Sequence, residues 1–159
     1  MSAREVMVTD LVTARGEETA GAVALRMLEH DLAAVPVVDD EDHILGVVSD
    51  VELIRLVVPA YMDLLEDTDF LPDDFEPFER RATAAGATLV RDIMSDQFET
   101  VSEDTSLPSI AAHLVRPGVR RVFVLRDGRL VGAIGRRDVF ATMFDRAHAR
   151  TGVDHGDLL

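Results

Sequence analysis

The sequence contains no cysteine, no lysine and no tryptophan. The absence of cysteine excludes disulfides, thiol nucleophiles and cysteine-ligated zinc, and suits a reducing compartment. The absence of lysine excludes Schiff-base chemistry and the phosphate-binding lysine of a P-loop. No apolar run approaches the roughly 18 residues of a membrane-spanning helix, and residues 1–13 lack the apolar stretch of a secretory signal. We therefore expect a cytoplasmic protein that holds no metal.

Positive charge is also scarce, because 30 acidic residues face 16 basic ones and the formal net charge is −14. A chain this acidic repels nucleic acid and anionic membranes, so we expect neither as a partner. The exception is residues 112–140, where seven arginines and two aspartates give a net charge of +5. These arginines either bind a phosphate or pair with acidic groups of the insertion or of a second subunit, and composition favours neither.

The chain repeats itself at a spacing of 87 residues, and the repeat governs the predicted fold. Residues 4–7 (Arg-Glu-Val-Met) recur as residues 91–94 (Arg-Asp-Ile-Met). The apolar positions of residues 20–28 recur in residues 107–115, with the i, i+3, i+4, i+7, i+8 spacing of one buried helix face. Two different patterns kept at one spacing indicate that the two halves fold alike.

Each half continues with two β-rich runs around a polar turn and then a second amphipathic helix. We align these parts at a spacing of 86, with one extra residue near Ala33. Asp127-Gly128 in the second turn is a strong hairpin signal. An extended lead-in, helix, strand, strand and helix in each half predict an α/β fold, with two repeats packed sheet to sheet in pseudo-two-fold symmetry. The matched segments are 35–38 with 121–124, 44–48 with 130–134, and 53–58 with 139–144.

We divide the chain into a first repeat (residues 1–58), an insertion (59–89), a second repeat (90–150) and a tail (151–159) that we expect to be frayed. The insertion carries eight acidic residues before its first basic one, Arg80. Its many large apolar side chains do not suit a disordered linker, so we expect an ordered helical insertion. Its aromatic residues are candidate anchors for a partner protein. They are Tyr61, Phe70, Phe75 and Phe78.

The repeated lead-in and helix, a Val-Pro-Val-Val-Asp strand at residues 35–39 and a Gly-Val-Val-Ser-Asp-Val-Glu turn at residues 46–52 resemble tandem CBS domains, the cystathionine-β-synthase type. The resemblance covers residues 3–58 and 90–144. It implies a non-catalytic regulatory module that often dimerises. Such modules often bind AMP, ADP or ATP, and sometimes S-adenosylmethionine, in the cleft between the two domains. The family's ligand motif is Gly-h-x-h-Thr/Ser-x-x-Asp, with h apolar; its aspartate typically holds ribose hydroxyls and its Thr/Ser lies near the phosphates.

The first copy of this motif has Ser49 but carries Glu52 in place of the aspartate. Glutamate is one methylene longer and would push a ribose away. Ser-x-x-Glu is also a capping box at a helix start, and we favour that interpretation. Asp50 and Glu52 would also repel a phosphate there.

The second copy keeps Asp138 but has Gly135 at the hydroxyl position, which lets backbone amides approach an anion. Arg136 and Arg137 are unfavourable at a helix start unless an anion lies there, and arginine suits bidentate phosphate contacts. We therefore expect the main ligand site here. The resemblance adds further candidate contacts, for which strand formation and core packing are the alternatives. These are Arg120, Arg121, Val122, Phe123, Thr100, Thr13 and Pro36.

Three functions compete at this stage. The first is a sensor that binds an adenine nucleotide and transmits its occupancy to a partner protein. The second is an interaction module that binds no small molecule and uses the acidic, aromatic insertion, since both ligand motifs are imperfect. An enzyme is third, because no nucleophile, base or metal set emerges. The first two predict a homodimer that buries the outward faces of the second helices. The residues expected there are Leu53, Ile54, Val57, Val139, Phe140 and Met143.

Overall fold

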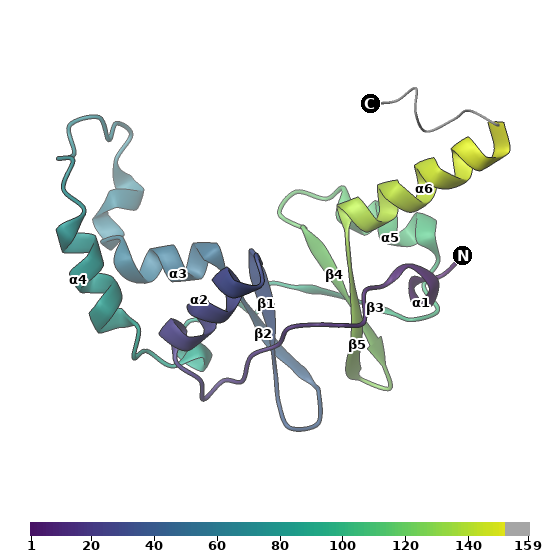
Figure 1. Ribbon diagram of the computed structural model, residues 1–159, viewed down its shortest axis with the longest axis horizontal. Helices are drawn as coiled ribbons and strands as arrows, with labels where there is room; N and C mark the ends of the chain where they lie inside the picture. Colours follow the sequence, from purple (N-terminus) through teal and green to yellow (C-terminus); the bar gives the residue numbers. More distant parts are fainter. Residues whose placement is uncertain (152–159) are drawn as a thin grey trace. The chain divides into compact units, whose positions relative to one another are not determined.

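The computed structural model describes residues 1–151, which form two compact units (Figure 1). Unit 1 contains Met1–Leu11 and the chain from Phe98 onward, and unit 2 contains Val12–Gln97. The tail that we expect to be frayed lies outside the described residues, except for Thr151 at the end of the last helix. Each unit therefore combines the hairpin and helices of one sequence repeat with the lead-in of the other repeat.

Unit 1 is built on a three-stranded sheet with the order β3-β4-β5. β3 is parallel to β4, and β4 pairs with β5 in an antiparallel hairpin. Asp127 and Gly128 both have positive φ, as a two-residue hairpin turn requires, so the predicted hairpin is confirmed. The elements are α1 (Ala3–Val6), β3 (Glu99–Ser102), α5 (Leu107–Leu114), β4 (Arg121–Arg126), β5 (Arg129–Gly135) and α6 (Arg136–Thr151).

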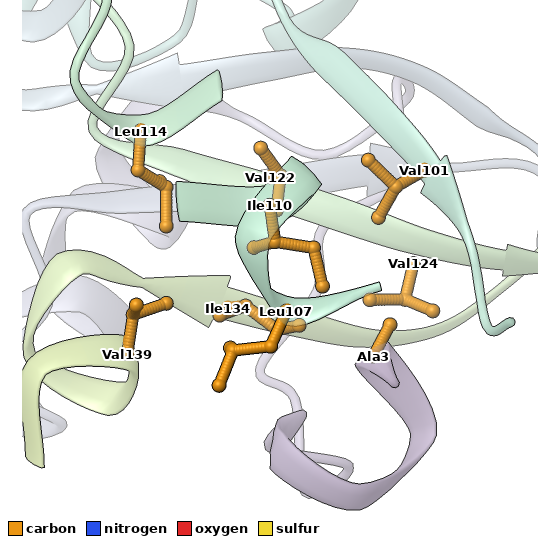
Figure 2. Packing of buried hydrophobic residues seen from close by; sticks show 9 residues of the cluster. All are labelled: Ala3, Val101, Leu107, Ile110, Leu114, Val122, Val124, Ile134 and Val139. Carbon is orange, nitrogen blue, oxygen red and sulfur yellow. The ribbon is translucent and has the colours of Figure 1, made fainter. Parts of the chain in front are cut away.

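The core of unit 1 lies between one face of this sheet and the helices. Figure 2 shows its nine buried side chains, which come from α1, α5, α6 and all three strands. Alternate residues of β4, Val122 and Val124, are fully buried in this core, so Arg121 and Phe123 lie on the opposite face of the sheet. This second face carries three of the candidate ligand contacts of unit 1, namely Thr100, Arg121 and Phe123.

Unit 2 repeats this plan with a smaller sheet. Its hairpin joins two antiparallel strands, and Ala14 forms a single parallel bridge to Val37 where unit 1 has the whole of β3. Thr13, which we expected to open a strand, therefore lies in no strand, whereas Thr100 lies within β3. The repeated elements of unit 2 are α2 (Ala20–Glu29), β1 (Ala34–Val38), β2 (Ile44–Ser49) and α3 (Asp50–Val57).

The strand register corrects the sequence alignment of the two hairpins. Ala34 pairs with Ser49 in unit 2, as Arg121 pairs with Gly135 in unit 1. The spacing of 87 therefore persists through the first strand, and the one-residue difference lies in the turn instead of near Ala33. As a result Ala34, and not Val35, is the counterpart of Arg121.

The two lead-ins occupy equivalent places in the two units. Val8 bridges Ala133 on β5, and Ser95 bridges Val47 on β2. They are not simply extended, as we predicted, because they begin with α1 in unit 1 and with the 3-10 helix η2 (Val90–Asp92) in unit 2. A methionine of each lead-in also packs against a glycine of a strand. The contact is so close that a Cβ on the glycine would collide with the sulfur atom of the methionine. The pairs are Met7 with Gly132 and Met94 with Gly46.

The insertion is ordered and helical at both ends, as predicted, with the 3-10 helix η1 (Ala60–Leu64) and the helix α4 (Glu76–Ala85). The backbone between them, residues 65–75, forms no helix, and we name this segment the acidic loop. Two hydrogen bonds join α4 and its C-cap residue, Gly86, to the rest of unit 2. Arg81 donates from Nε to the carbonyl of Val57 at 2.6 Å, and the Gly21 amide donates to the carbonyl of Gly86 at 2.9 Å.

The outward helix faces differ from the prediction in one respect. Val139 is only 6% exposed and belongs to the core of unit 1, so it cannot contribute to a dimer surface. Leu53 packs in part against the core of unit 2. Ile54, Phe140 and Met143 are exposed as expected. Within residues 1–151 no helix combines the length and the apolar character needed to cross a membrane.

Candidate ligand-binding site

The second motif lies where β5 ends and α6 begins. Gly135 is the last residue of β5, and its amide donates to Oδ2 of Asp138 in the first turn of α6 at 2.8 Å. The carboxylate thus satisfies one amide at this turn. No described residue donates a hydrogen bond to the other carboxylate oxygen, Oδ1 of Asp138.

Arg136 has a structural role that the sequence did not indicate. Its side chain donates from Nε to the carbonyl of Leu114 at 2.8 Å and from Nη2 to the carbonyl of Val119 at 2.5 Å. Leu114 is the last residue of α5, so the guanidinium lies at a helix C-terminus, where a positive charge is favourable. A bound anion is therefore not needed to explain this arginine.

Three other arginines gather at the same corner of unit 1. Arg121 begins β4 and pairs with Gly135 at the end of β5. The carbonyl of Arg120 lies 4.0 Å from the position that a Cβ on Gly135 would take, and Arg137 is the second residue of α6. We name Arg120, Arg121 and Arg137 the arginine edge. All three are exposed, and none forms an ion pair with a described residue.

Two other arginines of the basic stretch have acidic partners. Nη2 of Arg126 lies 2.7 Å from Oε2 of Glu103, and Nη1 of Arg116 lies 3.6 Å from Oε1 of Glu99. Acid pairing, one of the two interpretations of the basic stretch, therefore applies to these residues. It does not account for the arginine edge within the part of the chain that the structure describes.

The sheet face beside the arginine edge carries the remaining candidates of unit 1. Thr100 pairs with Phe123 across β3 and β4, and Arg121 lies two residues before Phe123 on the same face. Thr100 is exposed, while Phe123 is only 4% exposed and packs edge-to-face with Phe98 at 6.4 Å between ring centroids. Val122 points into the core, so only its backbone can contact a ligand on this face.

The first motif, in unit 2, forms the capping box that its sequence indicates. The Ser49 amide donates to Oε2 of Glu52 at 2.7 Å, and the Ser49 hydroxyl also contacts this carboxylate. Pro36 is buried in β1, and its carbonyl accepts a hydrogen bond from the Ala14 amide at 2.9 Å. The carboxylate of Glu52 is thus committed to the start of α3.

The corner of unit 2 has no counterpart of the arginine edge. With the corrected alignment, Ala33, Ala34 and Val51 occupy the three equivalent positions, and Asp50 replaces Arg136. Oδ1 of Asp50 is buried and has no hydrogen-bond partner among the described residues. The duplicated corners therefore differ by at least four positive charges, and only the corner of unit 1 carries arginines at these positions.

Two further side-chain clusters lie beside the candidate threonines in the chain, and sequence reasoning missed both. Arg26 on α2 donates from Nη1 to the Thr13 carbonyl at 3.0 Å and also pairs with Glu18. The Arg26 guanidinium holds the pKa of the Glu18 carboxyl below its usual range. In unit 1, His113 on α5 pairs with Glu99, the residue before Thr100. No local pattern marks these residues, because their partners lie on other elements.

No group of three or more histidine, aspartate or glutamate side chains within residues 1–151 is arranged to hold a metal ion. The chemistry that the described site offers is instead ionic and hydrogen-bonding recognition. Arginines would meet an anion, a carboxylate oxygen would meet a hydroxyl, and a threonine and an aromatic ring lie on the adjoining sheet face.

Comparison with known proteins identifies similar chains. An uncharacterised protein of Methanopyrus kandleri is 28% identical over 140 residues, which make up 87% of this chain and 61% of that protein. This chain thus spans less than two thirds of that relative's length. The solved CBS domain of a membrane protein from Sphaerobacter thermophilus has a TM-score of 0.69 and 27% identity, covering 89% of this chain and 86% of that one.

The structure of CBSX2, a CBS-pair protein from Arabidopsis thaliana, in complex with AMP has a TM-score of 0.69 and 22% identity. It covers 92% of this chain and 98% of that one, and at this identity the likeness shows the fold. Residues 3–59 and 90–145 each match the family model of the CBS domain. The chain therefore belongs to the CBS domain family and carries two tandem copies of the domain.

Proposed function

We propose that the chain is a non-catalytic regulatory module that binds an adenine nucleotide at the corner of unit 1. The observation that carries this proposal is the arginine edge, whose three guanidinium groups have no acidic partner within residues 1–151. Guanidinium groups pair bidentately with phosphate oxygens. Asp138 lies at the same corner and keeps one carboxylate oxygen for a ribose hydroxyl. The AMP complex of CBSX2 supports the same ligand class.

The proposal assigns one nucleotide to each chain. The corner of unit 2 has alanine and valine at the positions of the arginine edge, and it adds the carboxylates of Asp50 and Glu52. A phosphate there would be repelled, and no arginine would compensate for the lost hydration of the anion. Thr13, Pro36, Ser49 and Glu52 therefore have structural roles in this proposal, as Arg136 has in unit 1, while the other candidates of unit 1 bind the ligand.

Calorimetric titration of the full chain with AMP, ADP, ATP and S-adenosylmethionine tests the proposal. We expect binding of at least one nucleotide with a stoichiometry near one per chain. The double variant Arg121→Gln/Arg137→Gln should lose this binding, because both charges face the same anion. Arg129→Gln is the matched control, because Arg129 is exposed at the opposite end of the same hairpin. Absence of both heat and a thermal shift with all four compounds would refute the nucleotide site.

Nucleotide binding would be transmitted to a partner protein if the nucleotide stabilises one conformation of the chain relative to another. The coupling free energy between two such sites is typically about 1–3 kcal/mol. We propose a homodimer as the form that carries this signal. Phe140 and Phe144 on α6 contact each other edge-to-face, with 6.5 Å between ring centroids, and both are exposed. Met143 is exposed between them in the sequence. Light scattering that shows a monomer at micromolar concentration would contradict this dimer.

A ligand-free interaction module is the second candidate, and the exposed aromatics of the insertion favour it. Tyr61, Phe70 and Phe75 are exposed, while Phe78 is partly buried and lies 6.0 Å from Phe75 between ring centroids. A partner captured by the wild-type chain, lost on replacing these aromatics and kept by Asp138→Ala would favour this function. Nucleotide binding that is lost in Asp138→Ala would favour the first.

A further inference from the structure

The acidic loop, residues 65–75, is an exposed surface with no basic residue and five acidic ones. Phe70 and Phe75 within it are 68% and 69% exposed. None of the five carboxylates forms an ion pair with a described residue. The carboxylates of Asp67 and Asp74 accept hydrogen bonds from backbone amides inside the insertion. The carboxylates of Glu66, Asp69 and Asp73 accept no hydrogen bond from a described residue.

The acidic loop is held at both ends. η1 precedes it, and α4 follows it with its attachments to α2 and α3 in unit 2. The Leu71 amide donates to the Thr68 carbonyl at 3.0 Å, which adds a turn within the loop. Its carboxylates and aromatic rings are therefore presented together by a folded frame, which lowers the entropy lost when they dock on another surface.

The arginine edge complements this surface in charge and in chemistry. It carries three exposed guanidinium groups that have no ion-pair partner within the described residues 1–151, in a chain whose net charge is −14. Guanidinium groups bind carboxylates bidentately and also stack on aromatic rings. The acidic loop supplies both carboxylates and exposed phenylalanine rings, so one surface satisfies both preferences of the other.

We propose that the acidic loop of one chain docks on the arginine edge of a second copy of the chain. Each copy offers one acidic loop and one arginine edge, so two copies related by a two-fold axis form two identical contacts and close the assembly. This interface is an alternative to the exposed face of α6 as the contact of the proposed homodimer, and it does not depend on the nucleotide site. A further consequence does rest on the proposed nucleotide site: a bound phosphate and the acidic loop would compete for the same arginines, so nucleotide would weaken this contact.

The test measures self-association of the full chain by sedimentation equilibrium at 50 and 500 mM NaCl. The edge variant carries Arg120→Gln, Arg121→Gln and Arg137→Gln. The loop variant carries Glu66→Gln, Asp69→Asn and Asp73→Asn, which leaves the backbone-bonded carboxylates of the loop intact. The charge-matched control replaces three exposed acids outside the insertion. These are Asp10→Asn, Glu17→Gln and Glu29→Gln.

We expect high salt to weaken wild-type association about tenfold or more, because exposed ion pairs are screened. The edge and loop variants should each associate as weakly at low salt as the wild type does at high salt, while the control behaves as wild type. Mixing the two variants should form a heterodimer at lower concentration than either variant self-associates, since one loop and one edge remain intact. Sodium tripolyphosphate should weaken wild-type association.

Three results would overturn the proposal. A dimer with the same affinity in the wild type and both variants would place the interface elsewhere, for example on the exposed face of α6. A mixture that associates no better than the separate variants would mean that the loop and the edge do not meet between chains. Association independent of salt would exclude an ionic interface. If tripolyphosphate dissociates the dimer but no adenine nucleotide does, the interface stands and only the nucleotide site fails.

Discussion

Replacement of Gly132 by alanine should destabilise the protein through a clash with the lead-in from the other repeat. A Cβ at this position would lie 2.6 Å from Sδ of Met7, 2.9 Å from its Cγ and 3.0 Å from its Cβ. These distances are well inside van der Waals contact, so the Met7 side chain, or the lead-in that carries it, must shift. Overpacking of this kind costs typically about 1–3 kcal/mol. We expect Gly132→Ala to lower the free energy of unfolding, measured by urea denaturation, by about this amount.

The control for this prediction lies three residues along β5. A Cβ on Gly135 would lie 3.6 Å from its nearest neighbour, Oδ2 of Asp138, which is ordinary contact. Gly135→Ala should therefore change the free energy of unfolding by no more than about 0.5 kcal/mol, as expected where no steric conflict arises. The comparison separates the clash with Met7 from any general intolerance of alanine in this strand.

A double-mutant cycle identifies the cause. In a Met7→Ala background the sulfur and Cγ are gone and only the 3.0 Å approach of the two Cβ atoms remains. Gly132→Ala should then cost much less, giving a coupling of about 1–2 kcal/mol between the two positions. Equal costs in both backgrounds, or a Gly132→Ala variant as stable as wild type, would refute the claim that the lead-in packs against this strand.

Three further predictions concern single contacts. The guanidinium groups of Arg126 and Arg4 lower the pKa of Glu103 from 4.5 to about 2, so its ionised form stabilises the fold above pH 4.5 and this contribution disappears as the pH falls toward 2. Unfolding of Glu103→Gln, followed over this range, should lose that part of the pH dependence, and an unchanged profile would count against it. Glu52→Ala should cost about 0.5–2 kcal/mol by removing the capping box yet leave nucleotide affinity unchanged; a loss of affinity would assign Glu52 to a ligand site. Arg81→Ala removes the hydrogen bond to Val57 and should speed proteolysis within the insertion, whereas cleavage at the wild-type rate would show that α4 is held by other contacts.

The sequence was sufficient to predict the repeated architecture because local patterns carry it. The buried helix faces of residues 20–27 and 107–114 follow from apolar spacing, although the last predicted position of each face, Leu28 or Val115, is exposed. Asp127-Gly128 specifies its turn without help from the rest of the fold. The capping box at Ser49 and Glu52 is equally local. Each of these features needs only residues that are close together along the chain, so a single sequence is enough to place it.

The register of the first strand could not be obtained in this way. The valine-rich residues 35–38 match the second repeat equally well at a spacing of 86 or of 87. Apolar residues occupy the odd and the even positions of this strand alike, so the apolar pattern does not fix the register. Only the strand pairing separates the two spacings, because Ala34 pairs with Ser49 as Arg121 pairs with Gly135. The correct register matters for the site, since it makes Ala34 the counterpart of Arg121.

The sequence also did not predict that each lead-in packs in the unit of the other repeat, or that Arg136 has a structural role, for a related reason. The partner of Met7 is a glycine 125 residues further along the chain, and glycine leaves no mark in an apolar pattern. The partners of Arg136 are backbone carbonyls, which every residue possesses. Contacts of these kinds depend on where elements meet, and that is set by the packing of whole units.

The duplicated corners show which parts of the repeat are needed for folding and which are free to change. In both units the first-turn acid of the helix, Glu52 or Asp138, accepts the amide of the last strand residue. That interaction stabilises the helix start and is kept. The flanking positions carry no such requirement, and they hold alanine or valine in unit 2 but arginine in unit 1. Exposed arginines contribute little to stability, so three of them gathered at one corner without an acidic partner among residues 1–151 support the proposed anion site.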